Sequence, residues 1–415
     1  MLRIATNMPN DDMQYRLRRQ EEALARTQAQ IAGQSRLQQL RIDPLAASHT
    51  VRYDSYLARL ERFEKNTLYA VDHLDQTDSY LQHANDVLQR IREIAVQGAN
   101  GVYTQEDMQY MATEINELLK EIVATANIRG ADGAQIFSGD KGLTEPFRIV
   151  EGPVNGGGEP MIVRVEYRGA GASRRTEISD GSYIDLDISG GEAFWAENMQ
   201  IFSSVDASDY RVTQSGAIFI DGVEINLSPG DTVGTIIAKI NDSPAPVKAY
   251  LDVSSRGINL QGTNPHLIRV EDALGSTVMQ DLGIIRATAD ASAPNWNPNA
   301  RVAGGSAFDM IIDLRDALFR GDYNHVGSRG LTGLDQALNN IETRITEIGS
   351  RSERAHFAWK KVNAEIPQIT EGLDRENGIN MATAAVDLSM MDFAYKATLQ
   401  TAARIIPTTL LDFLR

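Results

Sequence analysis

The sequence of 415 residues contains no cysteine, which excludes disulfides, thiolate metal sites and cysteine catalysis. No stretch approaches the ~18 apolar residues of a membrane-spanning helix. The first residues also lack the basic-then-apolar layout of a cleaved secretion signal. Positive charge is scarce, since 40 Lys and Arg stand against 56 Asp and Glu, for a formal net charge of −16. Nucleic-acid binding needs a basic surface, so we expect no nucleic-acid partner. Because no apolar stretch is long enough to span a membrane, we expect no membrane partner either.

Side chains for catalysis or metal binding are also few. The chain has 6 histidines, and His73 and His83 are not at the four-residue spacing of a helical metal site, which favours ordinary helix residues. Asp185 and Asp187 alternate on one predicted strand, and a solvent-facing strand surface explains them better than a cation site. Ser306 lacks the flanking glycine of a nucleophile elbow and is explained as a helix cap. We therefore expect no enzyme, no catalytic residue, no metal site and no cofactor.

Two long apolar stripes dominate what the sequence does contain. Over 53–98 and again over 331–373, apolar residues recur at alternating steps of three and four, which is the heptad pattern of paired helices. Each run predicts a helix of roughly 65–70 Å at 1.5 Å per residue. We expect these stripes to form one helical seam within the chain. Its predicted members are Leu60, Phe63, Leu74, Leu81, Leu88, Leu338, Ile341, Ile345, Ile348 and Trp359.

Capping residues mark where the helices begin. Asp43 before Pro44 is a typical start for the first long helix. Thr104 and Ser306 each precede an Asp at the third helical position, in the manner of a capping box. Thr332 is the predicted start of the second long helix.

The middle of the chain changes period and composition. Residues 151–300 hold 20 Asp and Glu against 10 Lys and Arg, with 17 of the 33 Gly and 8 of the 13 Pro. Apolar alternation predicts strands over Met161–Tyr167, 182–188 and 217–227, the last with an Asp221-Gly222 hairpin turn. The predicted fold class is therefore α+β and multidomain: a long antiparallel helical coiled-coil bundle is built from both termini, with an inserted, mainly β outer domain.

The two terminal helices carry thinner apolar stripes. A helix with so little apolar surface is marginal alone, because helices gain most of their stability from packing. We expect residues 1–40 and 378–415 to become ordered when subunits assemble. The predicted subunit-assembly residues are Ile4, Met13, Leu17, Leu24, Ile31, Leu388, Met391, Tyr395, Leu399, Ile406 and Leu410.

Several short motifs, in order along nearly the whole chain, resemble the flagellin superfamily. They are Met1-Leu2-Arg3-Ile4-Ala5-Thr6-Asn7-Met8, Asp43-Pro44-Leu45-Ala46-Ala47-Ser48, Ile136-Phe137-Ser138-Gly139 and Leu410-Leu411-Asp412-Phe413-Leu414. The stretch 217–284 resembles the motif shared by flagellins and hook-associated proteins. Within the superfamily the chain looks most like the FlgL family, also called hook-associated protein 3; the resemblance is least distinct over about 145–215.

The resemblance implies a structural protein of the bacterial flagellum that forms the layer between the hook-associated proteins and the flagellin filament. Implied partners are further copies in a ring or helical layer, the other hook-filament junction protein, flagellin, an export chaperone and the type III export apparatus. It implies export from the cytoplasm, to the exterior or to a periplasm. The expected domains are 1–50 with 375–415, 51–143 with 300–374, and 144–299.

Two other functions fit the same sequence. Flagellin, the bulk filament subunit, shares the architecture. Only the amino-acid sequences of residues 43–48 and of the C-terminal segment favour the junction protein. A secreted adhesin or carbohydrate-binding protein acting through residues 145–296 is the alternative from another class.

Overall fold

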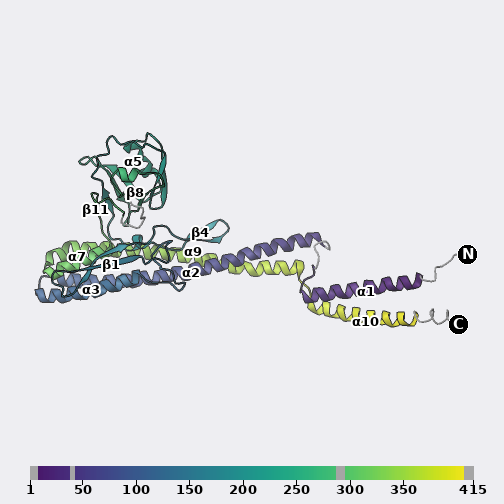
Figure 1. Ribbon diagram of the computed structural model, residues 1–415. Coiled ribbons are helices and arrows are strands. Elements are labelled where there is room, and N and C mark those ends of the chain that lie inside the picture. The colour runs from purple at the N-terminus through teal and green to yellow at the C-terminus, as the bar shows by residue number, and fades with distance from the viewer. Residues whose placement is uncertain (1–7, 38–42, 287–294, 406–415) are drawn as a thin grey trace, which may run out of the picture. The chain divides into compact units, whose positions relative to one another are not determined.

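The computed structural model describes residues 8–37, 43–286 and 295–405, in two compact units. Unit 1 combines the two ends of the chain, Met1–Lys65 and Trp359–Arg415, and unit 2 is Asn66–Ala358. All the strands named below lie in unit 2 (Figure 1).

Two long helices, α2 (Pro44–Ala99) and α9 (Leu331–Asn377), pass from one unit into the other. Unit 1 adds α1 (Met8–Ala32) and α10 (Met381–Ile405). Unit 2 adds α3 (Gln105–Ala126), α7 (Ala307–Arg320), the short α8 (Tyr323–His325) and a π-helical segment, Val326–Gly330. The long helices expected from the two apolar stripes are therefore present.

The predicted caps of α3 and α7 form as expected. The hydroxyl of Thr104 accepts the backbone N–H of Asp107 at 3.2 Å, and the Asp107 carboxylate accepts the N–H of Thr104 at 3.0 Å. Ser306 and Asp309 make the same pair of bonds at 3.2 and 2.9 Å. Each box satisfies two N–H groups that a helix start would leave unpaired.

The predicted start of α9 at Thr332 lies one residue after its first residue, Leu331, but Thr332 is not its cap. Asp322 accepts the N–H of His325 at 3.0 Å as the cap of α8, and the backbone stays helical from Tyr323 through the π-helical segment into α9. The Thr332 hydroxyl donates to the Ser328 carbonyl at 2.8 Å, one turn back inside the helix. An aspartate outside the helix competes better for the cap than a threonine that already has a helical carbonyl within reach.

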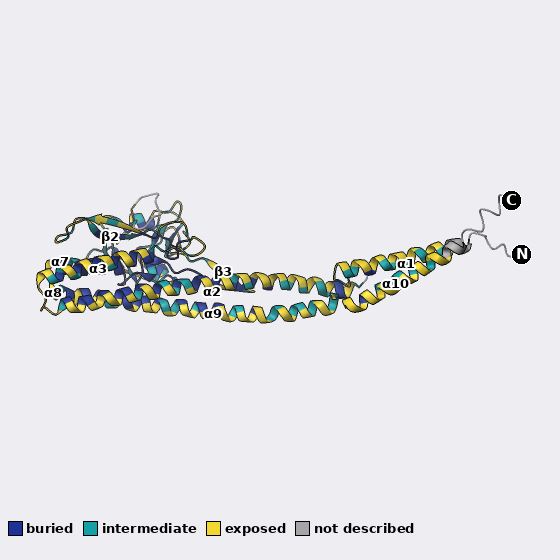
Figure 2. Ribbon diagram, turned by 90° about the horizontal axis from the view of Figure 1, so that it is seen from below, coloured by how far each residue is buried: buried dark blue, intermediate teal, exposed yellow. Residues whose placement is uncertain are grey.

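In unit 2, α2 and α9 run antiparallel along the predicted seam. Ser352 donates to Asp75 at 2.6 Å, and Arg92 pairs with Asp335 at 2.6 Å, so positions rise along one helix as they fall along the other. The predicted seam residues buried here are Leu74, Leu81, Leu88, Leu338, Ile341 and Ile348, while Ile345 is half-buried. Figure 2 shows this dark-blue lining on the helices of unit 2.

A fully buried arginine joins three elements beside the seam. α7 packs on both α3 and β2 (Met161–Tyr167). From α7, Arg315 donates to the Asn116 side chain at 2.9 Å, to the Ile162 carbonyl at 2.8 Å and to Asp316 at 2.7 Å. A buried charge is tolerated only when it is paired and hydrogen-bonded, so these bonds fix how α3, α7 and β2 meet.

The strands form four small antiparallel sheets. The elements are β1 (Phe147–Gly152) with β2; β3 (Arg175–Ser179) with β4 (Ser182–Asp185); β10 (Val270–Asp272), β6 (Gly216–Ile220) and β7 (Val223–Leu227); and β11 (Arg301–Ala303), β5 (Gln200–Phe202), β9 (Ile258–Gly262) and β8 (Val247–Leu251). Short helices α4 (Gly190–Ala193), α5 (Val233–Asp242) and α6 (Val278–Asp281) lie between them in the chain. The hairpin predicted over 217–227 is confirmed: Asp221 and Gly222 adopt φ of 50° and 79°, the left-handed pair of a tight turn.

An aromatic cluster forms the centre of unit 2. The ring centroids of Phe147 and Phe308 lie 4.9 Å apart, and those of Phe137 and Phe194 lie 5.2 Å apart. Next to it, Gly139 adopts φ 65°, and a Cβ there would lie 2.7 Å from the carbonyl oxygen of Ala170. The Ile136–Gly139 motif therefore belongs to the core, and its glycine is required by a close backbone approach.

Asp187 corrects the prediction of a solvent-facing strand. β4 ends at Asp185, and the Asp187 side chain is completely buried. It accepts hydrogen bonds from Arg174 at 2.8 Å and lies 2.9 Å from His73 Nε2. Burial raises the pKa of Asp187, but the bonds to Arg174 and His73 outweigh burial and hold the pKa below its ordinary value.

Candidate assembly interface

In unit 1, α1 and α10 pack against each other in antiparallel fashion. The hydroxyl of Thr27 lies 3.4 Å from the Met391 sulfur, and Ser35 forms an antiparallel bridge with Gly378. This pairing covers one side of each helix. In Figure 2 the yellow of exposed residues nevertheless dominates both helices.

Seven of the predicted assembly residues lie half-buried on these two helices. They are Met13, Leu17, Leu24, Ile31, Leu388, Met391 and Tyr395. Leu399 is 41% exposed. Ile4, Ile406 and Leu410 fall outside the described residues.

Asn377, at the end of α9, connects the loop after α1 to the start of α10. Its side-chain oxygen accepts the Ser35 hydroxyl at 2.7 Å and the Leu37 N–H at 3.0 Å, and its carbonyl accepts the Arg36 N–H at 2.8 Å. Three bonds from consecutive residues fix this crossing. Local sequence patterns could not predict this crossing, because the partners lie about 340 positions away.

The motif at 43–48 begins α2. Asp43 accepts the N–H of Ala46 at 3.1 Å, which confirms it as the cap. Ala46 and Ala47 are 4% and 5% exposed, whereas Pro44 and Ser48 are exposed. The motif therefore combines a helix start with two small side chains on a closely packed face.

The seam continues in unit 1 with a smaller core. Leu60 and Phe63 from α2 and Val362 from α9 form a separate buried cluster. Tyr56 donates to Glu365 at 2.5 Å beside it. The last predicted seam residue, Trp359, is half-buried.

A second apolar stripe on α10 points away from its packed side. Val386, Met390 and Phe393 are 57%, 61% and 76% exposed, and we call these three residues the outer stripe. Steps of four and three place them on one helix face. With Ala385 and Ser389 they line a shallow hollow. The spacing of the outer stripe is visible in the sequence, but the apolar pattern through Leu388, on the opposite face of the helix, is the stronger of the two.

The described residues hold neither a cluster of three or more His, Asp or Glu side chains able to hold a metal ion nor a helix suited to cross a membrane.

Comparison with known proteins agrees with the helical N-terminal region. Residues 4–141 match the bacterial flagellin N-terminal helical region, and residues 211–264 match the flagellin hook IN motif. Flagellin FlaB2 of Treponema pallidum (strain Nichols) is 33% identical over 225 residues, covering 53% of this chain and 67% of that protein. The chain belongs to the flagellin family. Proteins of this family are structural components of bacterial flagella and not enzymes.

Other relatives match over shorter stretches. Flagellin FlaB1 of the same organism is 32% identical over 108 residues, which is 26% of this chain and 37% of that protein. The chain thus matches well under two thirds of the length of this relative. Among solved structures, the flagellar hook-associated protein 3 of Legionella pneumophila is 17% identical with a TM-score of 0.47, over 78% of this chain and 97% of that one.

Proposed function

We propose that the chain is a structural subunit of the bacterial flagellum and forms the layer that joins the hook-associated proteins to the flagellin filament. The observation that carries the assembly role is the outer stripe: three large apolar side chains stay exposed on a terminal helix whose other side is already packed. Burial of such side chains against a neighbouring subunit stabilises each by roughly 1.5–3 kcal/mol.

The proposed partners follow from this role. Further copies of the chain cover the outer stripe within the layer, the other hook-filament junction protein lies on one side and flagellin on the other. Contacts of this kind are heterologous and repeat around an axis. The FlgL-like amino-acid sequences of residues 43–48 and of the C-terminal segment support the role of junction protein over that of bulk filament subunit.

The half-buried residues between α1 and α10 have a separate proposed role. They hold the two terminal helices together within one subunit and present the outer stripe. A chaperone and the type III export apparatus deliver the chain unfolded to the exterior or to a periplasm. The helical seam gives the layer its stiffness. It belongs mainly to the proposed domain of residues 51–143 and 300–374, beside a terminal domain of 1–50 with 375–415 and an outer domain of 144–299.

Seeded growth tests the proposed function. Purified protein is added to hook fragments that carry the other junction protein, and growth is followed by electron microscopy. We expect a short layer that stops and then accepts added flagellin. Continuous elongation by this protein alone would identify a bulk filament subunit and overturn the junction role.

A matched pair of variants tests the outer stripe. Phe393→Ser should abolish addition to the fragments, because it removes the most exposed apolar side chain of the stripe. Tyr110→Ser changes a ring that is 67% exposed on α3 in unit 2, and should leave addition intact. Equal loss in both variants would show that the stripe has no special role.

A further inference from the structure

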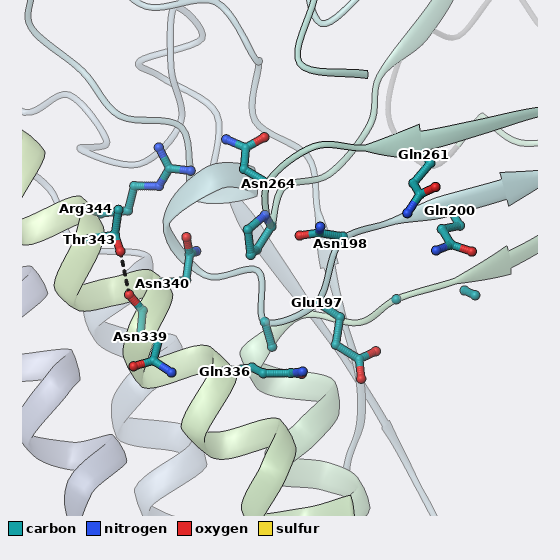
Figure 3. Close-up of a pocket in the computed structure, with 14 residues that line it drawn as sticks. Glu197, Asn198, Gln200, Gln261, Asn264, Gln336, Asn339, Asn340, Thr343 and Arg344 are labelled. Atoms are coloured by element: carbon teal, nitrogen blue, oxygen red, sulfur yellow. Dashed lines mark hydrogen bonds between the residues drawn. The ribbon is translucent and has the colours of Figure 1, made fainter. Parts of the chain in front are cut away.

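A polar cleft lies in unit 2 between α9 and the strand-rich part of the chain. Residues 196–200, 261–265 and 303–304 form one side, and residues 336–344 of α9 form the other. Its volume is about 780 Å³, within the range of sites for small ligands. In Figure 3, Asn340 and Arg344 from α9 lie around the same space as Asn198 and Asn264.

Amide side chains dominate the lining. Six of them are Asn198, Gln200, Gln261, Asn264, Gln336 and Asn339. The charged lining residues are Glu197 and Arg344, and Arg344 is already paired with Glu347 at 2.9 Å. Each amide offers both donors and an acceptor without net charge, so the cleft is suited to a neutral ligand rich in hydrogen-bonding groups.

Two buried polar atoms in this lining lack partners. Arg344 is only 8% exposed, and its Nε finds no hydrogen-bond partner among the residues that the structure describes. Within the same described part of the chain, the buried Asn264 Oδ1 is also without one. An unsatisfied buried donor or acceptor costs roughly 1–3 kcal/mol.

The wall of the cleft is held in place by Asn340. Its side-chain nitrogen lies 2.8 Å from the Glu192 carbonyl and 2.8 Å from the Trp195 carbonyl, so α9 is bonded directly to the segment before β5. A wall fixed before binding lowers the entropy lost when a ligand is bound.

An aromatic pocket adjoins the cleft. Gly304 lines both, and the second pocket, of about 290 Å³, contains Trp195 and Trp296. The indole Nε1 of Trp195 is buried with no acceptor among the described residues. Indole combines a large apolar face with one polar donor. The apolar face of an indole suits the C–H surface of a sugar ring.

We propose that this cleft and its aromatic pocket bind a neutral oligosaccharide. Each sugar hydroxyl donates and accepts at once, which matches the donors and acceptors of the amide lining. The neutral amide lining satisfies further hydroxyls, and the tryptophan pocket takes one ring. This site is independent of the junction role and of the outer stripe on α10.

Calorimetry on the full chain tests the site with three neutral probes, N,N′,N″-triacetylchitotriose, cellotriose and maltotriose, each to about 10 mM. We expect at least one to bind at a single site with Kd below about 1 mM and to change tryptophan fluorescence. Gln261→Leu, which alters a half-buried lining amide, should weaken binding by about tenfold. Asn299→Leu changes an exposed amide outside the cleft and should leave binding unchanged.

Three results would overturn the proposal. One is the absence of binding by all three sugars at the highest concentration. Another is binding of triglycine with none of the sugars, which would identify an extended peptide as the occupant. The third is binding that survives both Gln261→Leu and Asn264→Leu in variants whose unfolding midpoints match the parent protein.

Discussion

The helices α7 and α10 show how differently the two units are stabilised. α7 has 14 residues, and ten of them are buried. α10 has 25 residues, yet Ala384 is the one buried residue among its described side chains, and the outer stripe is largely exposed. α7 packs on α3 and β2, whereas α10 packs mainly on α1. Since packing supplies most of a helix's stability, we expect unit 2 to be stable in a single chain and the terminal helices to depend on a second surface.

The sharpest test of this difference removes one phenylalanine from each helix. Phe308→Ala, in the aromatic cluster, should lower the free energy of unfolding by about 3–5 kcal/mol. Phe393→Ala, at 76% exposure, should change it by less than about 0.5 kcal/mol in the monomer. Urea unfolding followed by tryptophan fluorescence measures both. Similar losses in the two variants would mean that α10 is well packed before assembly.

A glycine substitution tests how tightly unit 2 is packed. Gly139→Ala places a Cβ against two backbone carbonyls and also strains a left-handed conformation, so we expect a loss of about 2 kcal/mol or more. Gly181→Ala is the control, since Gly181 has φ 69° but no atom within 4 Å of its added Cβ. Gly181→Ala should lower the free energy of unfolding by about 1 kcal/mol, the cost of the left-handed backbone conformation alone. Equal thermal unfolding midpoints for the two variants would contradict the close approach at Gly139.

The crossing at Asn377 tests whether unit 1 has a fixed part of its own. Asn377→Ala removes the acceptor of Ser35 and Leu37, which should cost about 1–2 kcal/mol locally. Hydrogen exchange should speed up over residues 33–37 in the monomer. Asn380→Ala, which removes only the cap of α10 at Ala382 and Thr383, should leave these amides unchanged. If the exchange rates over residues 33–37 were the same in the two variants, the crossing would form only on assembly.

The smallest expected effect is a pH dependence confined to unit 2. His266 lies 3.1 Å from Asp221 and 2.8 Å from the Asn264 carbonyl. Burial lowers the pKa of His266, but the bond to Asp221 and its charge outweigh burial and raise the pKa above its ordinary value. The resulting stabilisation is fully present below the unfolded pKa of about 6.5 and is lost as pH rises through the higher folded value.

Urea midpoints at about pH 6 and pH 8.5 should therefore differ in the parent protein and converge in His266→Gln. Asp221→Asn should flatten the dependence too, because asparagine tolerates the left-handed backbone at this turn and lacks the charge. In unit 1, the His49–Glu376 pair is about one third exposed on both sides, and His49→Gln should have little effect. If His49→Gln changed the pH dependence of the urea midpoint more than His266→Gln does, the pH dependence would not be confined to unit 2.

Local patterns predicted the elements that depend on near neighbours. Heptad spacing identified α2 and α9, the Thr104 and Ser306 boxes fixed two helix starts, and Asp221-Gly222 located a hairpin. Each of these is decided within a few residues of sequence. The start of α9 was predicted to within one residue, but its cap was not, because the helical backbone reaches back through the π-helical segment to α8, where Asp322 is the cap.

Features assembled from distant segments could not be predicted in this way. Alternation at Asp185 and Asp187 suggested a solvated strand, but Arg174 and His73 cover Asp187 from elsewhere in the chain. The crossing at Asn377 and the amide cleft also combine residues that are far apart in sequence. For the outer stripe the pattern was present, but deciding which of two faces stays exposed required knowing what packs on the other.

The seam has a consequence for the order of events during synthesis. Asp75 pairs with a residue 277 positions later, and Tyr56 with one 309 positions later. At roughly 5–20 residues per second, a ribosome delivers the second half of the seam about 15–60 s after the first. Contacts of such high sequence separation also form slowly. The newly made chain therefore passes through a period in which α2 has been synthesised but α9, its partner in the seam, has not.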